Sequence, residues 1–479
     1  MERLPAIIDG KDVETSTFFV TEDPSTGKPL AEVARCGKAE IDAAVSAARS
    51  AFEGAWPATP VAERGRTLKR VADLIRRDRE NLALTESRDT GKPLRQARTD
   101  VDVAARYFEF YGGTIDAFYG ETIPLSDELI AYTLREPFGV TAHIVPWNYP
   151  IQISARTISP ALAVGNCCVL KPAEEAPLTA LRLARLCVEA GLPAGALNVV
   201  PGFGEEAGAP LAAHPGIDHL SFTGSMEVGK LVQKATADNV VPVALELGGK
   251  SPNVVFADAD LEAALPVIVN SILQNAGQTC SAGSRLLVEE RIHDDVVGAV
   301  AERFSAVRIG PGPDDPDLGP LISKQQLERV RGFVEGTRDQ ARLVIGGTSP
   351  EGMDGGYYFS PTLFDQVSSD APIAREEVFG PVLAVTPFRG LDEAIRLTNA
   401  TDYGLVTAVW TRDVTTAHRL ARAARSGQVY VNTYGAGGGV ELPFGGFKRS
   451  GYGREKGFEA LHTYSQVKTV TIRLPGRSG

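Results

Sequence analysis

The chain is poor in the residues on which secreted and metal-binding proteins depend. It has only five cysteines and six histidines in 479 residues. A low, odd number of cysteines argues against a disulfide framework and favours a cytoplasmic location. The histidines and cysteines are scattered, and none has the spacing of a zinc site, so we expect no metal. The opening MERLPAIIDGKDVET has no apolar signal region, and no run of about 18 apolar residues occurs, so neither secretion nor membrane insertion is expected.

The charge balance is acidic. Lysine and arginine total 49 against 60 aspartates and glutamates, which gives a formal net charge of −11. Nucleic acids and anionic membranes are bound by basic patches, so neither is an expected partner. The length indicates about two to four domains.

Residues 138–248 alternate between short apolar runs and amphipathic segments. The runs Val140–Val145, Cys167–Leu170, His219–Gly224 and Val241–Leu247 are expected strands, with a further one in LNVVPG. Helices such as TALRLARLCVEAGLP separate them. This alternation predicts a parallel sheet covered by helices on both faces, with ligands beyond the carboxyl ends of its strands.

Two other regions have regular patterns. Glu40–Gly112 has apolar residues at helical spacing and is expected to pack on a larger domain without chemistry of its own. Ser251–Val431 shows a second strand–helix alternation, in which LEAALPVIVNSILQNAG (residues 261–277) is an expected helix. The sequence therefore predicts a second α/β domain.

Two extended segments far apart in sequence alternate apolar and polar residues, namely Glu121–Pro137 and Thr463–Leu474. They could pair as an antiparallel ribbon. The open edges of a protruding ribbon are usually covered, often by another subunit. We therefore expect a homo-oligomer, either a dimer or a tetramer.

Cys280 lies in NAGQTCSAGSR, between Gly277 and Gly283. Small neighbours leave the thiol accessible and let backbone NH groups approach a ligand. The alternative is a buried loop cysteine, and that interpretation is assigned to the other four cysteines: Cys36, Cys167, Cys168 and Cys187.

Two polar residues at strand ends suit acid–base and oxyanion chemistry. Glu246 ends an apolar strand before two glycines, where partial burial would raise its pKa and suit it to general-base work. The alternative is a structural carboxylate bonded to the glycine turn. Asn148, in IVPWNYP, could donate its amide to an oxyanion or could simply cap a helix.

Two strand-end loops suit a dinucleotide. Gly224 and Ser225 open a helix whose backbone NH groups would favour phosphate. Lys171 and Glu174 follow another strand, where a carboxylate could bind ribose hydroxyls and favour NAD over NADP. The alternatives are a simple strand–helix turn and a solvated ion pair.

In sequence order, VPWNYP, LKPAEEAP, FTGSMEVG, ELGGKSP, GQTCSAGSR, REEVFGPV and LPFGGFKRSGYGRE together resemble the aldehyde dehydrogenase superfamily. The resemblance runs from DPSTGKPLAEV to VKTVTI. It implies an α/β fold with three parts: a Rossmann-like cofactor-binding domain (1–120 and 138–248), a catalytic domain (249–448) and a protruding oligomerisation ribbon (121–137 and 455–479).

The resemblance also assigns roles. Cys280 would be the nucleophile, Glu246 the general base and Asn148 the oxyanion donor. Lys171 and Glu174 would hold the adenine ribose, and Glu377 and Phe379 the nicotinamide ribose and ring. The remaining residues assigned to NAD, or to NADP as the alternative, are Val145, Pro146, Trp147, Gly204, Gly224, Ser225, Val228 and Leu247.

These roles imply a hydrolytic oxidation of an aldehyde. A thiolate attacks the carbonyl, the thiohemiacetal loses hydride to the nicotinamide, and Glu246 activates water to hydrolyse the thioester. Acylating relatives, which release the acyl group to coenzyme A, typically lack this glutamate.

The substrate tunnel departs from the common family pattern. Arg156 and Thr157 replace a frequent Trp-Lys pair, which puts a proton relay through that lysine in doubt, although Glu455 matches a second carboxylate on the same path. Arg156 could grip a substrate carboxylate, as in succinate-semialdehyde enzymes, or could be a structural ion-pair partner. Gln274 stands where the succinate-semialdehyde type has a second arginine.

The other substrate residues are expected to leave a roomy site. Tyr149 is assigned to the substrate wall, and the loop residues Gly435, Gly437, Gly438 and Gly439 add little side-chain bulk. We therefore expect an aromatic or carboxylate-bearing aldehyde.

Three alternative functions are compatible with parts of the sequence. The first is a coenzyme A-acylating or succinate-semialdehyde-type dehydrogenase. The second is a non-enzymatic structural member of the family, which the presence of Cys280, Glu246 and Asn148 disfavours. The third is a generic dehydrogenase with a His–Asp pair, which would need a histidine at a strand end near a phosphate loop.

Overall fold

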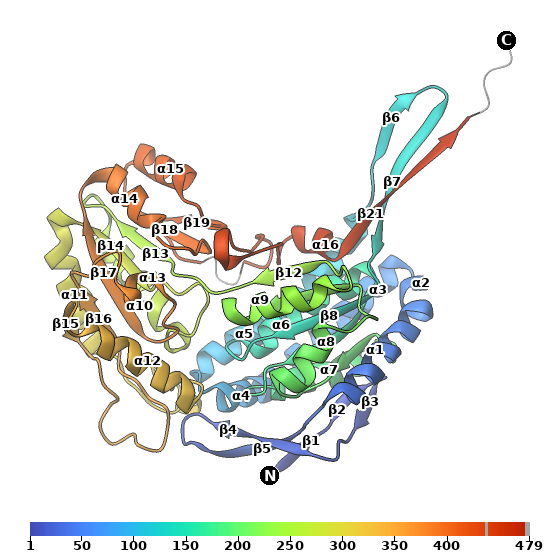
Figure 1. Cartoon of the computed structure of the whole chain (residues 1–479), viewed down its shortest axis with the longest axis horizontal. Coiled ribbons are helices and arrows are strands. Elements are labelled where there is room, and N and C mark those ends of the chain that lie inside the picture. The colour runs from blue at the N-terminus through green and yellow to red at the C-terminus, as the bar shows by residue number, and fades with distance from the viewer. Residues whose placement is uncertain (436–438, 475–479) are drawn as a thin grey trace.

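The computed structural model describes residues 1–435 and 439–474. Two large sheets form two lobes side by side, and a ribbon projects from the first lobe (Figure 1). The predicted α/β fold with a protruding ribbon is confirmed. No helix within the described ranges is long and apolar enough to span a membrane.

The first lobe is built on an eight-stranded sheet. In spatial order its strands are β20 (Gly451–Tyr452), β12 (Val243–Glu246), β11 (His219–Thr223), β8 (Val140–Val145), β9 (Cys167–Pro172), β10 (Leu197–Val199), β2 (Ala6–Ile8) and β3 (Lys11–Val13). The five strands from β12 to β10 are parallel. They are apolar runs because helices bury both of their faces.

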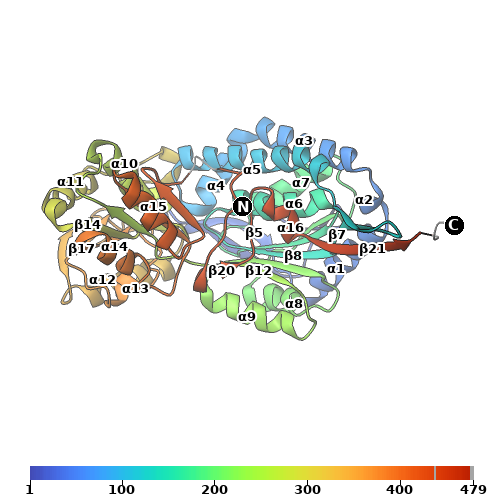
Figure 2. The ribbon, with the colours of Figure 1, turned by 90° about the horizontal axis from the view of Figure 1, so that it is seen from above.

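Helices cover the two faces unequally (Figure 2). On one face lie α3 (Val61–Arg77), α4 (Arg79–Thr90), α5 (Leu94–Thr114), α6 (Pro150–Val164) and α7 (Leu178–Glu189). On the other lie α1 (Lys38–Glu53), α8 (Ala209–Ala212) and α9 (Met226–Ala237). The expected helical region Glu40–Gly112 therefore contributes most of one layer of this lobe.

The second lobe has a seven-stranded sheet. Its strands in order are β15 (Arg342–Ile345), β16 (Thr362–Asp365), β17 (Val382–Phe388), β14 (Arg285–Glu289), β13 (Pro252–Val255), β18 (Val406–Trp410) and β19 (Gln428–Val431), with only β15 antiparallel to its neighbour in the described part. Its main helices are α10 (Leu261–Leu273), α11 (His293–Ser305), α12 (Lys324–Thr337), α14 (Gly390–Thr398) and α15 (Val414–Ala423), with the short α13 (Pro372–Arg375).

The ribbon pairs segments from the two ends of the chain. Strand β7 (Leu129–Pro137) lies between β6 (Thr122–Ser126) and β21 (Ser465–Arg473), and both pairs are antiparallel. The predicted pairing is therefore confirmed. The ribbon strand begins at Ser465, later than the expected boundary at residue 455, because α16 (Glu459–Thr463) packs on α6 instead.

Two expectations about local structure were wrong. The first sheet is not purely parallel, because β20, β2 and β3 join it antiparallel. The expected helix over 261–277 ends at Leu273, because Asn275 and Ala276 adopt left-handed backbone angles. The sequence also gave no sign of the small sheet of β1 (Glu2–Leu4), β4 (Phe18–Asp23) and β5 (Lys28–Ala34).

Candidate active site

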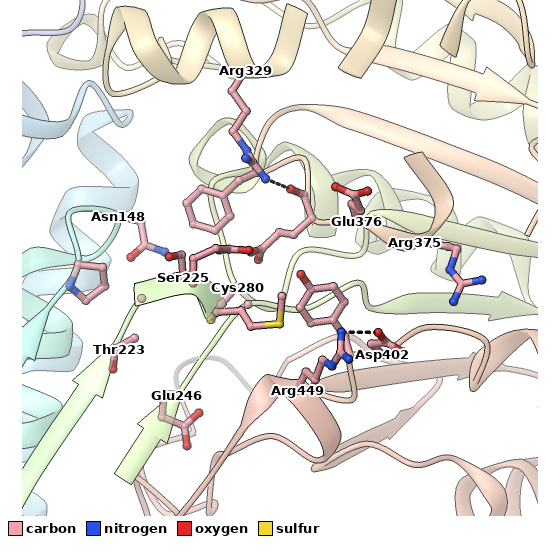
Figure 3. Close-up of a pocket in the computed structure, with 18 of the residues that line it drawn as sticks. Asn148, Thr223, Ser225, Glu246, Cys280, Arg329, Arg375, Glu376, Asp402 and Arg449 are labelled. Carbon is pink, nitrogen blue, oxygen red and sulfur yellow. Dashed lines mark hydrogen bonds and ion pairs between the residues drawn. The ribbon is translucent and has the colours of Figure 1, made fainter. Parts of the chain in front are cut away.

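A cleft of about 760 Å³ lies between the two lobes. The first lobe contributes residues that follow β8, β11 and β12, so the cleft is at the carboxyl ends of the parallel strands, as predicted. Figure 3 shows several of these side chains around the cleft. Nine of the predicted site residues line it: Pro146, Trp147, Asn148, Gly224, Ser225, Glu246, Cys280, Glu377 and Phe379.

Cys280 follows a tight turn after α10. Its thiol is partly exposed to the cleft, unlike the four other cysteines, which are buried free thiols. Burial raises the pKa of Cys280 to about 12, while the positive charge of Arg156 opposes this effect. A resting thiol in this position is protonated, so a nearby base must accept its proton before attack.

Asn148 lies three residues beyond the end of β8 and is 3% exposed. Its Nδ2 donates to the backbone carbonyl of Gln278 over 3.0 Å. An asparagine amide has two N–H groups, so one remains for an oxyanion. Asn148 is not the helix cap that was the alternative interpretation, since Tyr149 occupies the N-cap of α6.

Glu246 ends β12 on the floor of the cleft. Neither of its carboxylate oxygens has a hydrogen-bond partner in the described part of the chain. Burial raises the pKa of Glu246 well above its ordinary value, the negative charge of Glu455 adds to this effect, and Arg156 opposes it. The rise of this pKa on burial agrees with the sequence-based expectation, and the role of Glu246 as general base remains a prediction.

The loop of Glu377 and Phe379 is fixed from two sides. Glu377 accepts a hydrogen bond from the Gly249 NH over 3.1 Å, and a side chain at Gly248 would collide with the same carboxylate, since its Cβ would lie 2.1 Å from Oε2. Phe379 has a φ of 60° and meets the Trp147 ring edge-on, with centroids 5.3 Å apart. A residue held in this strained conformation must be supported by its surroundings.

That support comes from α12. Gln326 donates to the Phe379 carbonyl over 2.7 Å, and Arg329 donates to the Glu377 carbonyl over 2.7 Å. Both side chains also line the cleft, yet the sequence analysis missed them. They lie on an ordinary amphipathic helix, so no local signal distinguishes them.

The remaining predicted cofactor residues lie outside the cleft lining. Lys171, near the end of β9, forms an ion pair of 2.8 Å with Glu174, which lies just beyond the strand. Val228, in the first turn of α9, donates its NH to the Oγ of the cleft-lining Ser225 over 3.3 Å. The other residues of this group are Val145, Gly204 and Leu247.

Arg156 forms a buried ion pair with Glu455. Its Nε lies 2.5 Å from the Glu455 carboxylate, and the two side chains are 7% and 1% exposed. The guanidinium also lies over the Phe444 ring, 5.4 Å from its centroid. The sequence left open whether Arg156 binds a substrate carboxylate or forms a structural ion pair, and the structure shows the ion pair with Glu455. Thr157 turns away and hydrogen bonds to His143 and Tyr464.

Aromatic side chains flank the nucleophile. The Tyr149 hydroxyl lies 2.8 Å from Oγ1 of Thr279, and Tyr434 donates to the Ser281 carbonyl over 2.6 Å. Phe444 packs in the same cluster as Cys280. Gln274 lies close enough to the Tyr149 hydroxyl to lower its pKa, although burial raises that pKa more strongly. Gly437 and Gly438 lie outside the described residues.

Comparison with known proteins identifies the class. The model of the aldehyde dehydrogenase family matches residues 11–470. An aldehyde dehydrogenase of Aspergillus niger is 43% identical over 98% of this chain and 95% of its own. Human retinal dehydrogenase 2 is 44% identical over 97% of this chain and 90% of its own.

Solved structures agree. The NAD+ complex of a Bacillus cereus aldehyde dehydrogenase superposes with a TM-score of 0.97 at 41% identity, covering 99% of this chain and 97% of that one. A mutant of the P. syringae indole-3-acetaldehyde dehydrogenase AldA, in complex with NAD+ and IAA, gives 0.96 at 42% identity, covering 98% and 96%. The chain belongs to the aldehyde dehydrogenase family. It is therefore an enzyme that oxidises aldehydes with a nicotinamide cofactor.

Proposed function

We propose that this enzyme uses NAD to oxidise an aromatic aldehyde to its carboxylic acid through a thioester on Cys280. The observation that carries the mechanism is the meeting of Cys280, Asn148 and Glu246 in one cleft, where the Glu246 carboxylate is buried without a hydrogen-bond partner in the described part of the chain. Glu246 favours hydrolysis, because it places a buried base beside the acyl group.

Cys280, Asn148 and Glu246 each have a different role in the reaction. The Cys280 sulfur bonds to the carbonyl carbon and its proton passes to Glu246, while the free N–H of Asn148 donates to the alkoxide. When bound, the nicotinamide supplies the acceptor for the hydride that leaves the carbon. Glu246 releases that proton to solvent and then takes a proton from the water that adds to the thioester. The sulfur leaves with its electron pair and takes up the second proton from Glu246. One aldehyde and one water give one acid, with the hydride and one proton as the other products.

Trapping the thioester tests this proposal. Glu246→Gln keeps the shape of the side chain but cannot accept a proton, so both the attack by Cys280 and the hydrolysis of the thioester should slow. We expect about one NADH per active subunit, formed more slowly than normal, followed by turnover about 10²- to 10⁴-fold slower than normal. Intact-protein mass spectrometry should show the acyl group on Cys280. Cys280→Ala should form neither NADH nor adduct. Normal steady-state turnover of Glu246→Gln, or rapid turnover only with coenzyme A, would contradict the hydrolytic mechanism.

The substrate class rests on the walls around Cys280. Tyr149, Tyr434 and Phe444 surround the thiol and its neighbours, whereas Arg156 is already neutralised by Glu455. Aromatic pairs stabilise by about 0.5–1.5 kcal/mol beyond area burial. An aromatic aldehyde therefore fits better than a carboxylate-bearing one, and the similar indole-3-acetaldehyde dehydrogenase acts on an aldehyde of that kind.

A substrate panel tests the class. Phenylacetaldehyde and indole-3-acetaldehyde should exceed hexanal in kcat/KM by about 2- to 10-fold, which corresponds to one aromatic contact. Succinate semialdehyde should be poorer than hexanal. If succinate semialdehyde is the best substrate, Arg156 must leave Glu455 to bind it, and the aromatic assignment is wrong.

Three further features belong to the proposal. The Glu174 carboxylate, anchored by Lys171, suits ribose hydroxyls and would repel a 2′-phosphate, which favours NAD over NADP. The open ribbon supports a homo-oligomer. The five free thiols suit the cytoplasm.

A further inference from the structure

A buried cluster of charges lies directly behind the oxyanion residue. Lys92, between α4 and α5, is fully buried. Its Nζ lies 2.6 Å from the Asp100 carboxylate and 3.3 Å from that of Glu86. The same Nζ donates to the backbone carbonyl of Asn148 over 2.9 Å, and it lies 4.5 Å from the Tyr149 ring centroid.

A second donor converges on that carbonyl from the other lobe. Asn275 donates to the Asn148 carbonyl through Nδ2 over 2.9 Å, and the same Nδ2 lies 3.3 Å from the Gln278 carbonyl. Gln278 in turn accepts from the Asn148 side chain. The Asn148 peptide is thus held on one side by Lys92 and on the other by the turn that precedes Cys280.

The first lobe also supports that turn. Asn275 and Ala276 have φ values of 51° and 54°, and Gly277 follows at 73°. The turn is held because the Asn275 NH donates to the Gln96 side chain of α5 over 3.0 Å. Two non-glycine residues in this region are costly, about 1–3 kcal/mol each, and persist only where surroundings enforce them.

Glu86 extends the cluster to α6. Its second carboxylate oxygen accepts from the Thr179 hydroxyl over 2.5 Å and from the Ile151 NH over 3.4 Å. Lys92 and Glu86 therefore fix the backbone on both sides of Tyr149, in the turn that carries Asn148. Burial raises the pKa of Asp100 to about 6 despite the opposing charge of Lys92.

We propose that Lys92, anchored by Glu86 and Asp100, is a positioning residue that aims the Asn148 amide at the oxyanion. This inference rests on the proposed role of Asn148. Misplacing a reacting group by about 1 Å can lower the rate about 10²-fold, so the rigidity of this peptide matters to the reaction. The segment Glu40–Gly112, for which no chemistry was expected, would thus affect the reaction by orienting the Asn148 amide.

A double-mutant cycle tests the proposal in the full-length enzyme. Asn148→Ala should lower kcat/KM about 10²- to 10³-fold, as expected for an oxyanion donor. Lys92→Met should lower it about 10- to 100-fold by misplacing that donor. If Lys92 acts through Asn148, adding Lys92→Met to Asn148→Ala should change kcat/KM by no more than about twofold.

A chemical readout separates positioning from general damage. Alkylation of Cys280 by iodoacetamide displaces iodide and develops no oxyanion, so its rate in Lys92→Met should stay within about twofold of normal. Arg64→Met is the matched control, because Arg64 donates to the Ala163 and Val164 carbonyls at the far end of α6. It should lower the unfolding temperature and leave kcat/KM unchanged.

The outcomes are distinct. Unchanged kcat/KM in Asn148→Ala would overturn the proposed oxyanion role itself. A loss in Asn148→Ala with none in Lys92→Met, additive losses, or an equal loss in Arg64→Met would overturn the positioning role alone.

If Lys92→Met does not fold, Asn275→Gly removes the other donor yet tolerates the left-handed turn. It should lower kcat/KM about 3- to 10-fold, again only when Asn148 is present.

Discussion

Glu246 combines two properties that conflict in an ordinary side chain. As a base it must ionise, yet its position in the sheet favours the neutral carboxyl, because burial and the Glu455 charge raise its pKa. The unfolded chain has no such environment, and there a glutamate titrates near about 4.3. The same burial that prepares Glu246 for catalysis should therefore appear in the stability of the fold.

The sign of this effect can be predicted. Below the pKa that Glu246 has in the unfolded chain, this carboxyl is protonated in both the folded and the unfolded state, and its burial does not destabilise the fold. As pH rises toward the folded pKa, only the unfolded state releases the proton, so the free energy of unfolding falls. Glu246→Gln lacks this loss. The stability of Glu246→Gln relative to the native enzyme should therefore be higher at pH 8 than at pH 5.

Urea unfolding of both proteins at the two pH values measures this difference. Glu206→Gln serves as the control: Arg35 lowers the pKa of Glu206, so this carboxyl is ionised in both states at pH 5 and pH 8, and its replacement should change the stability equally at the two pH values. An equal difference between native enzyme and Glu246→Gln at both pH values would show that folding does not perturb this carboxyl.

The residues that sequence could reveal share one property. Asn148, Glu246 and Cys280 lie in turns at strand or helix ends, where a polar residue among small neighbours is unusual. Lys92 could not be found in this way, because it contacts Asn148 across 56 positions of sequence. A lysine is ordinarily solvent-exposed, and only the fold shows that this one is enclosed by two carboxylates and a carbonyl.

At the level of elements, the long apolar runs were the predictable part. The strands β8, β9, β11 and β12 were found because burial on both faces leaves a continuous apolar segment. Strands β2, β3 and β20 have only two or three residues each and were not predicted, whereas the equally short β10 was found because it lies within the strand–helix alternation. So short a segment has no periodicity to read.

The end of α10 illustrates a different limit. The apolar pattern continues past Leu273, so local sequence favours more helix. Contacts from elsewhere decide otherwise: Gln96 holds the Asn275 NH, and a side chain at Gly277 would meet the Gly380 carbonyl at 2.1 Å. The turn that delivers Cys280 is therefore imposed by tertiary structure and could not be predicted from the segment itself.

The whole molecule leaves its ribbon with two open edges, on β6 and β21. Ile130 and Ile472 lie directly opposite each other on one face of the ribbon. Leu134 is on the same face, and the three side chains are 43%, 45% and 39% exposed. Unpaired edges with exposed apolar side chains are normally covered in a native protein. A second copy of the chain is the partner we propose.

Light scattering tests the assembly. The native enzyme should have a mass that is a multiple of 51.0 kDa. Ile130→Glu combined with Ile472→Glu should reduce it to a smaller multiple, because each carboxylate would be buried without a partner at the interface. Val414→Glu, at a 67% exposed apolar site on the second lobe, should leave the mass unchanged. A native mass equal to one chain would contradict the oligomer, and an unchanged mass in the ribbon variant would place the interface elsewhere.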